Sequence, residues 1–136
     1  MNIELQRVHK MPQTLEPGVL YVSEEYEIAM HICPCGCGSK VCTPIGPTDW
    51  RFKVGRHGPT LYPSIGNWQK PCQSHYWIRD GEIIWAPKWT QEEIVEGRRR
   101  EQEQSAAYFK ERERRRNRPL AKLWRRLIGP FTKKRP

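Results

Sequence analysis

Four of the five cysteines of this chain lie within ten residues, in the segment Cys33-Pro-Cys-Gly-Cys-Gly-Ser-Lys-Val-Cys42. The fifth, Cys72, is followed by His75 in the sequence Cys-Gln-Ser-His. Thiolates bind zinc tightly when several of them converge tetrahedrally, and glycine lets the backbone turn sharply between them. A metal shared by the two segments would join two distant loops, as a structural zinc ion does.

We therefore predict a structural zinc site, with Cys42 and His75 as alternative ligands. The four ligands that we predict are Cys33, Cys35, Cys37 and Cys72. Buried reduced cysteines are a weaker interpretation, because Pro-Cys-Gly-Cys-Gly is typical of a loop. A disulfide framework fits poorly with an odd number of cysteines, and a catalytic thiol needs one activated cysteine rather than several. A metallopeptidase using His31, His57 or His75 is a further alternative, but the sequence has no His-Glu-x-x-His motif.

Short segments rich in β-branched and aromatic residues recur before residue 90, separated by Gly and Pro, which predicts short strands. The predicted strands are Ile3–Val8, Val19–Val22, Tyr26–Ile32, Trp50–Val54, Thr60–Tyr62, His75–Arg79 and Glu82–Ala86. Asp80-Gly81 suits the type I′ turn of a hairpin. The aromatic residues expected in the core are Trp50, Trp68, Tyr76, Trp77, Trp85 and Trp89. A β domain this small would be marginally stable without a staple such as a metal ion.

The last third of the chain differs in charge from the rest. Residues 1–90 carry nine Lys or Arg and eight Asp or Glu, whereas residues 91–136 carry fifteen and seven. Thr90 and Glu93 form a capping box that predicts a helix from Gln91 to about Asn117. A second short helix is predicted from Pro119 to Gly129. Its apolar stripe would consist of Leu120, Leu123, Trp124, Leu127 and Ile128.

The predicted fold class is therefore mainly β, with a C-terminal basic helical tail, or α+β overall. We expect a zinc-binding β domain in residues 1–89 and the tail in residues 90–136. The sequence contains no apolar run near the roughly 20 residues that a membrane span needs. Its first residues, MNIELQRVHK, do not resemble a signal peptide, so we expect a cytoplasmic protein.

Three motifs in order carry a family resemblance: Cys-Pro-Cys-Gly-Cys-Gly, then Thr-Leu-Tyr-Pro-Ser-Ile, then Cys-Gln-Ser-His-Tyr-Trp-Ile-Arg-Asp-Gly-Glu-Ile-Ile-Trp. Together they resemble the BubE-like family of small bacterial proteins, over roughly residues 26–86. Members of that family are associated with bacterial ubiquitin-like conjugation operons and look like serine peptidases that process or remove a ubiquitin-like protein. The resemblance implies a ubiquitin-like protein as substrate.

The resemblance also implies two catalytic residues. The serine of the Pro-Ser-Ile motif is Ser64, and the histidine of the Cys-x-Ser-His motif is His75. A serine hydroxyl becomes an effective nucleophile when a neighbouring imidazole takes its proton. No third catalytic residue can be identified, since Asp80 is better explained as a turn residue and Asp49 is the only other aspartate.

Two functions follow as hypotheses. The first is a zinc-stabilised serine peptidase acting on a ubiquitin-like protein, with Ser64 as nucleophile and His75 as general base. The second is a non-catalytic zinc-binding module whose tail, residues 91–136, binds nucleic acid or another anionic partner.

Overall fold

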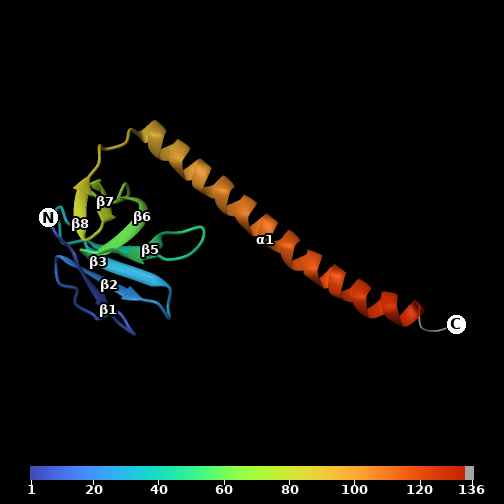
Figure 1. Cartoon of the computed structure of the whole chain (residues 1–136). Helices are drawn as coiled ribbons and strands as arrows, with labels where there is room; N and C mark the ends of the chain where they lie inside the picture. Colours follow the sequence, from blue (N-terminus) through green and yellow to red (C-terminus); the bar gives the residue numbers. More distant parts are fainter. Residues whose placement is uncertain (134–136) are drawn as a thin grey trace. The chain divides into compact units, whose positions relative to one another are not determined.

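The computed structural model describes residues 1–133, and it describes the side chains of residues 1–118. Eight short strands precede one long helix, α1 (Figure 1). The strands are β1 (Glu4–Arg7), β2 (Val19–Ser23), β3 (Ile28–Ile32), β4 (Lys40–Pro44), β5 (Arg51–Val54), β6 (Pro59–Gly66), β7 (His75–Arg79) and β8 (Glu82–Trp85). The mainly β fold class with a helical C-terminal part is thus confirmed, and so is the position of every predicted strand.

The strands form two four-stranded sheets, in the orders β1-β2-β3-β4 and β5-β6-β7-β8. Strand β1 runs parallel to β2, whereas all the other pairs are antiparallel. Strand β4 was not predicted. Its buried Val41 and Thr43 alternate with exposed residues, as expected of a half-buried strand.

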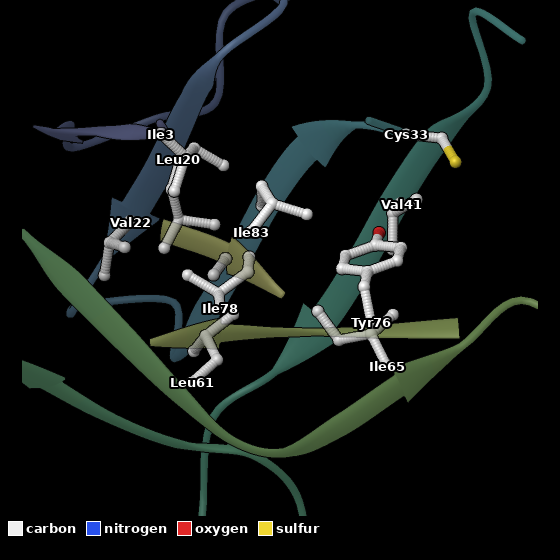
Figure 2. Packing of buried hydrophobic residues seen from close by; sticks show 11 residues of the cluster. Ile3, Leu20, Val22, Cys33, Val41, Leu61, Ile65, Tyr76, Ile78 and Ile83 are labelled. Carbon is white, nitrogen blue, oxygen red and sulfur yellow. The ribbon is translucent and has the colours of Figure 1, made fainter. Parts of the chain in front are cut away.

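Side chains from both sheets meet in one buried cluster (Figure 2). The first sheet contributes residues such as Leu20 and Val41, and the second contributes Ile65 and Tyr76. Figure 2 shows the ring of Tyr76 between Ile65 and Val41, so that this residue bridges the two sheets. Since Tyr76 is completely buried, it belongs to the core as expected, whereas Trp85 is half exposed and was wrongly assigned to the core.

The β7–β8 hairpin turns at Asp80-Gly81, as predicted. Both residues have positive φ, 47° and 78°, which is what a type I′ turn requires. The Asp80 carboxylate accepts a hydrogen bond of 2.9 Å from the backbone N–H of His57. The turn is therefore fastened to the loop that joins β5 and β6.

Helix α1 begins at Gln91, after the predicted capping box. The N–H of Glu93 donates to the Thr90 hydroxyl, and the N–H of Thr90 donates to the Glu93 carboxylate. Ion pairs between residues three or four positions apart, such as the pair of Arg99 and Glu103, lie on the solvent-exposed surface of the helix. No stretch of α1 is long and apolar enough to cross a bilayer.

The predicted break near Asn117 is wrong, because α1 continues to Lys133. Proline lacks an N–H, and within a helix it costs one hydrogen bond and crowds the preceding turn. Here Pro119 is flanked on both sides by good helix formers, mainly Arg, Lys, Leu and Ala, which favour continuation. The apolar stripe predicted between Leu120 and Ile128 consists of side chains that lie outside those described for residues 1–118.

The chain divides into two units, Met1–Ile94 and Val95–Pro136. The first contains both sheets, the loops between them and the start of α1. The second contains the rest of α1.

The Gly81 turn provides a stability prediction. Gly81 and Gly18 both have a φ of +78°, so alanine at either position incurs similar backbone strain. A Cβ at Gly81 would lie 2.6 Å from the carbonyl oxygen of His57, whereas at Gly18 the nearest atom is 3.9 Å away. We expect Gly18→Ala to lower the free energy of unfolding by about 1–2 kcal/mol and Gly81→Ala by a further ~1–3 kcal/mol. Urea denaturation measures both, and equal losses would contradict the packing at the turn.

Candidate active site and cysteine cluster

Ser64 and His75, which the family resemblance paired, lie within hydrogen-bonding distance. Ser64 is in β6 and His75 begins β7, and Ser64 Oγ lies 2.9 Å from His75 Nε2. His75 is buried, with 5% of its surface exposed, whereas Ser64 is partly exposed. Ser64 is therefore partly open to solvent, while the imidazole of His75 is shielded from water.

An irregularity in β6 sets the direction of the Ser64 side chain. Leu61 pairs with Ile78 and Ile65 pairs with Tyr76, so four steps along β6 correspond to two steps along β7. The extra residues between Leu61 and Ile65 include Ser64 and form a bulge. Bulges redirect side chains out of the regular alternation of a strand, and Ser64 here faces the histidine of the neighbouring strand.

The other ring nitrogen of His75 determines the tautomer of the imidazole. His75 Nδ1 lies 2.7 Å from the backbone carbonyl oxygen of Pro87. Since a carbonyl oxygen can only accept a hydrogen bond, Nδ1 must carry a proton and donate it. In the neutral ring Nε2 then has a free lone pair, which accepts the Ser64 hydroxyl proton. The Pro87 carbonyl thus takes the position that a carboxylate has in a Ser-His-Asp triad.

Three tryptophans surround the His75 ring. The ring centroids of Trp68, Trp89 and Trp77 lie 5.0, 5.2 and 6.0 Å from that of His75. Trp68 and Trp89 also stack on each other, with centroids 5.4 Å apart. These three aromatic residues, expected in the core, instead form a wall that fixes the imidazole and limits its contact with water.

Gly66 allows this wall to approach the strand. A Cβ at Gly66 would lie 2.4 Å from Nε1 and 2.5 Å from Cε2 of Trp68, too close to the indole ring for either to stay in place. Only glycine therefore leaves room for the Trp68 ring over β6, directly beside His75.

The four cysteines predicted as metal ligands also converge. The Sγ atoms of Cys33, Cys35, Cys37 and Cys72 all lie within 4.8 Å of one another. In a tetrahedral zinc site with Zn–S bonds of about 2.3 Å, sulfur atoms are separated by about 3.8 Å. The Cys33 sulfur lies 3.4 Å from that of Cys35 and 4.0 Å from that of Cys72, so the cluster fits a metal ion of this size.

Sharp turns bring these sulfur atoms together. Cys33 follows β3, and Gly36 and Gly38 adopt φ values of +90° and +79° in the turn that precedes β4. Cys72 comes from the loop between β6 and β7. The cluster therefore connects a turn of the first sheet to a loop of the second. Cys42, which we considered as an alternative ligand, lies exposed on β4 outside the cluster.

Buried polar side chains support the cluster. The amide of Asn67 donates to the Ser74 hydroxyl at 2.8 Å, and this hydroxyl lies 3.1 Å from the sulfur of Cys33. Hydrogen bonding to Ser74 lowers the pKa of Cys72, and hydrogen bonding to Ser39 lowers the pKa of Cys37 to about 6. Two of the four thiols are thus biased toward the thiolate form that binds metals.

The histidines have other partners. His31 is completely buried, with Nε2 2.6 Å from the Tyr76 hydroxyl, and burial lowers its pKa to about 4. His57 lies beside Asp80, and His75 is held by Ser64 and Pro87. Within residues 1–118, the metal-binding cluster contains only cysteines, which argues against the metallopeptidase alternative.

A model of the family described as bacterial ubiquitination-like system serine protease (BubE) matches residues 7–86, more than half of the chain. The chain belongs to the BubE family. Comparisons with curated proteins and with solved structures found no match. The BubE match includes Ser64, His75 and the four clustered cysteines, whereas Pro87 lies one residue beyond it.

Sequence reasoning missed two parts of this site. The Pro87 carbonyl has no sequence signal, because every residue provides a carbonyl group. The tryptophan wall was visible as an aromatic-rich sequence, but composition does not distinguish a wall around one histidine from a core.

Removing one clustered thiol tests the metal site. We expect the purified chain to contain about one zinc per molecule, and Cys72→Ser to lose most of it, because a hydroxyl is a poor zinc ligand. Cys42→Ser is the matched control and should retain the metal. Elemental analysis and thermal unfolding with and without a chelator provide the measurement. Equal metal contents in the two variants would contradict the predicted ligand set.

Proposed function

We propose that this BubE-family chain is a zinc-stabilised serine peptidase that processes or removes a ubiquitin-like protein. Ser64 is the nucleophile and His75 the general base. The observation that supports this most directly is the continuous chain of hydrogen bonds from the Ser64 hydroxyl through His75 to the Pro87 carbonyl. The family description supports the reaction class and a ubiquitination-like context.

The proposed reaction is acyl transfer in two stages. Ser64 Oγ attacks the carbonyl carbon of the scissile bond while its proton passes to His75 Nε2. The tetrahedral intermediate collapses and the C–N bond of the peptide or isopeptide linkage breaks. The imidazolium returns its proton to the departing amine. Water then attacks the acyl-enzyme, with His75 again taking the proton, and Ser64 is restored as the acid is released.

The edge of β6 next to Ser64 has no partner among the described strands. Strand β5 pairs with β6 only as far as Tyr62, and no strand of the described chain pairs on that side with residues 63–66. An extended peptide can add to an open edge through main-chain hydrogen bonds. The N–H groups of Ile65 and Gly66 are the candidates for stabilising the oxyanion, since they follow the nucleophile directly.

The metal ion is proposed to act on structure rather than on the reaction. Cys33, Cys35, Cys37 and Cys72 would hold zinc, which would supply a rigid link between the two sheets. Cys72 lies three residues before His75, so the link would fix the start of β7, where the base is located. Ser74 connects the cysteine cluster to the Ser64–His75 pair, because its side chain contacts Cys33 and it directly precedes His75 in the chain.

The nucleic-acid hypothesis gains no support from the family match, which ends before residues 91–136.

Cleavage of a candidate ubiquitin-like precursor tests the mechanism. We expect Ser64→Ala and His75→Gln each to lower kcat/KM by at least about 10³-fold, because each removes one partner of the proton transfer. Ser105→Ala, in α1, is the control and should cleave at the wild-type rate. Mass spectrometry of the products identifies the cleaved bond. Undiminished cleavage by Ser64→Ala would refute Ser64 as the nucleophile.

A further inference from the structure

A groove on the second sheet carries an unusual concentration of positive charge. It has a volume of about 700 Å³ and is lined by residues of β5, β6, β7 and the adjoining turns. Its basic residues are Arg51, Lys53, Arg56 and Arg79. The Tyr62 ring, 64% exposed, provides an aromatic surface in the same groove.

These positive charges are not neutralised within the protein. Among the side chains of residues 1–118, none of the four basic groups forms an ion pair. The single acid of the groove, Asp80, is already engaged, since it accepts the His57 N–H and lies near the His57 ring. Four cations near one another repel, so the groove favours a ligand with negative charge.

The groove is built on the same two strands as the Ser64–His75 pair. Tyr62 lies two residues before Ser64 in β6, and Arg79 lies four residues after His75 in β7. Trp77 connects the two regions: its ring centroid is 6.0 Å from that of His75, and the Arg79 guanidinium lies 5.9 Å from the Trp77 ring centroid. The groove and the candidate catalytic pair therefore share strands β6 and β7.

We propose that this groove is a specificity site that binds an acidic segment of the substrate polypeptide. The proposal rests on the proposed peptidase function and adds the chemistry by which the substrate is recognised. In a peptide with its scissile bond at Ser64, the residues on one side of that bond would extend along β6 toward the groove. Carboxylates at these positions pair with the Arg and Lys side chains, and an apolar side chain packs on Tyr62.

A peptide fits this place better than a nucleic acid does. The groove shares strands β6 and β7 with a candidate peptidase centre, and two of its cations, Arg51 and Lys53, lie two residues apart on β5, as same-face side chains of an extended peptide do. An oligonucleotide that binds the groove more tightly than the acidic peptide would overturn the proposal.

Binding to a chain that cannot cleave separates recognition from catalysis. The full-length Ser64→Ala protein is titrated with a fluorescent Glu-rich peptide and with its Gln-substituted counterpart, and anisotropy gives each Kd. We expect the Glu-rich peptide to bind at least about tenfold more tightly. Adding Arg51→Gln and Lys53→Gln should weaken its binding about tenfold. The control pair Lys10→Gln and Arg98→Gln removes the same charge elsewhere and should leave the Kd unchanged.

The location of binding and the cleavage assay decide the remaining outcomes. NMR shifts on peptide addition should concentrate at Tyr62 and Arg79, whereas shifts confined to residues 91–136 would overturn the proposal. Equal weakening by the groove and control pairs would also overturn it. If wild-type protein cleaves acidic and neutral substrates equally well, the groove proposal fails while the peptidase proposal stands. If the peptide binds the groove but no substrate is cleaved, the peptidase proposal fails, and the groove remains only a binding site for acidic peptides.

Discussion

The convergence of four thiols between two sheets is the constraint on which this small domain depends. Each sheet has only four short strands, and the shared core is modest, so a metal ion held by these thiols would have a large effect on stability. The same loop that provides Cys72 leads directly into His75. The cysteine cluster and the placement of His75 therefore depend on one segment, and loss of the cluster would disturb both.

Most of the fold could be predicted from the sequence because its signals are local. Alternating apolar residues, Gly and Pro boundaries, and the Asp80-Gly81 turn locate the strands. Strand β4 was missed because Cys42 was interpreted together with the metal loop, which hid the alternation of Val41 and Thr43. The helix break at Pro119 was wrong because a local rule about proline was outweighed by the helix-forming residues around it. The parallel pairing of β1 with β2 depends on long-range contacts, which no local pattern indicates.

The candidate site was less predictable, for a physical reason. The residues of the Ser64–His75 pair and the cysteines are chemically distinctive, so sequence motifs could point to them. Their surroundings are made of generic groups, such as a backbone carbonyl, indole rings and a glycine without a side chain. Gly66 illustrates this, because its role is to leave space for Trp68, and space is visible only in three dimensions. Geometry rather than residue type makes these groups part of the site.

The Pro87 carbonyl orients His75 with a dipole instead of a full negative charge. A dipole fixes the ring but stabilises an imidazolium less than a carboxylate does. For the serine mechanism proposed above, more of the transition-state stabilisation would then have to come from donors around the oxyanion than from the partner of the imidazolium.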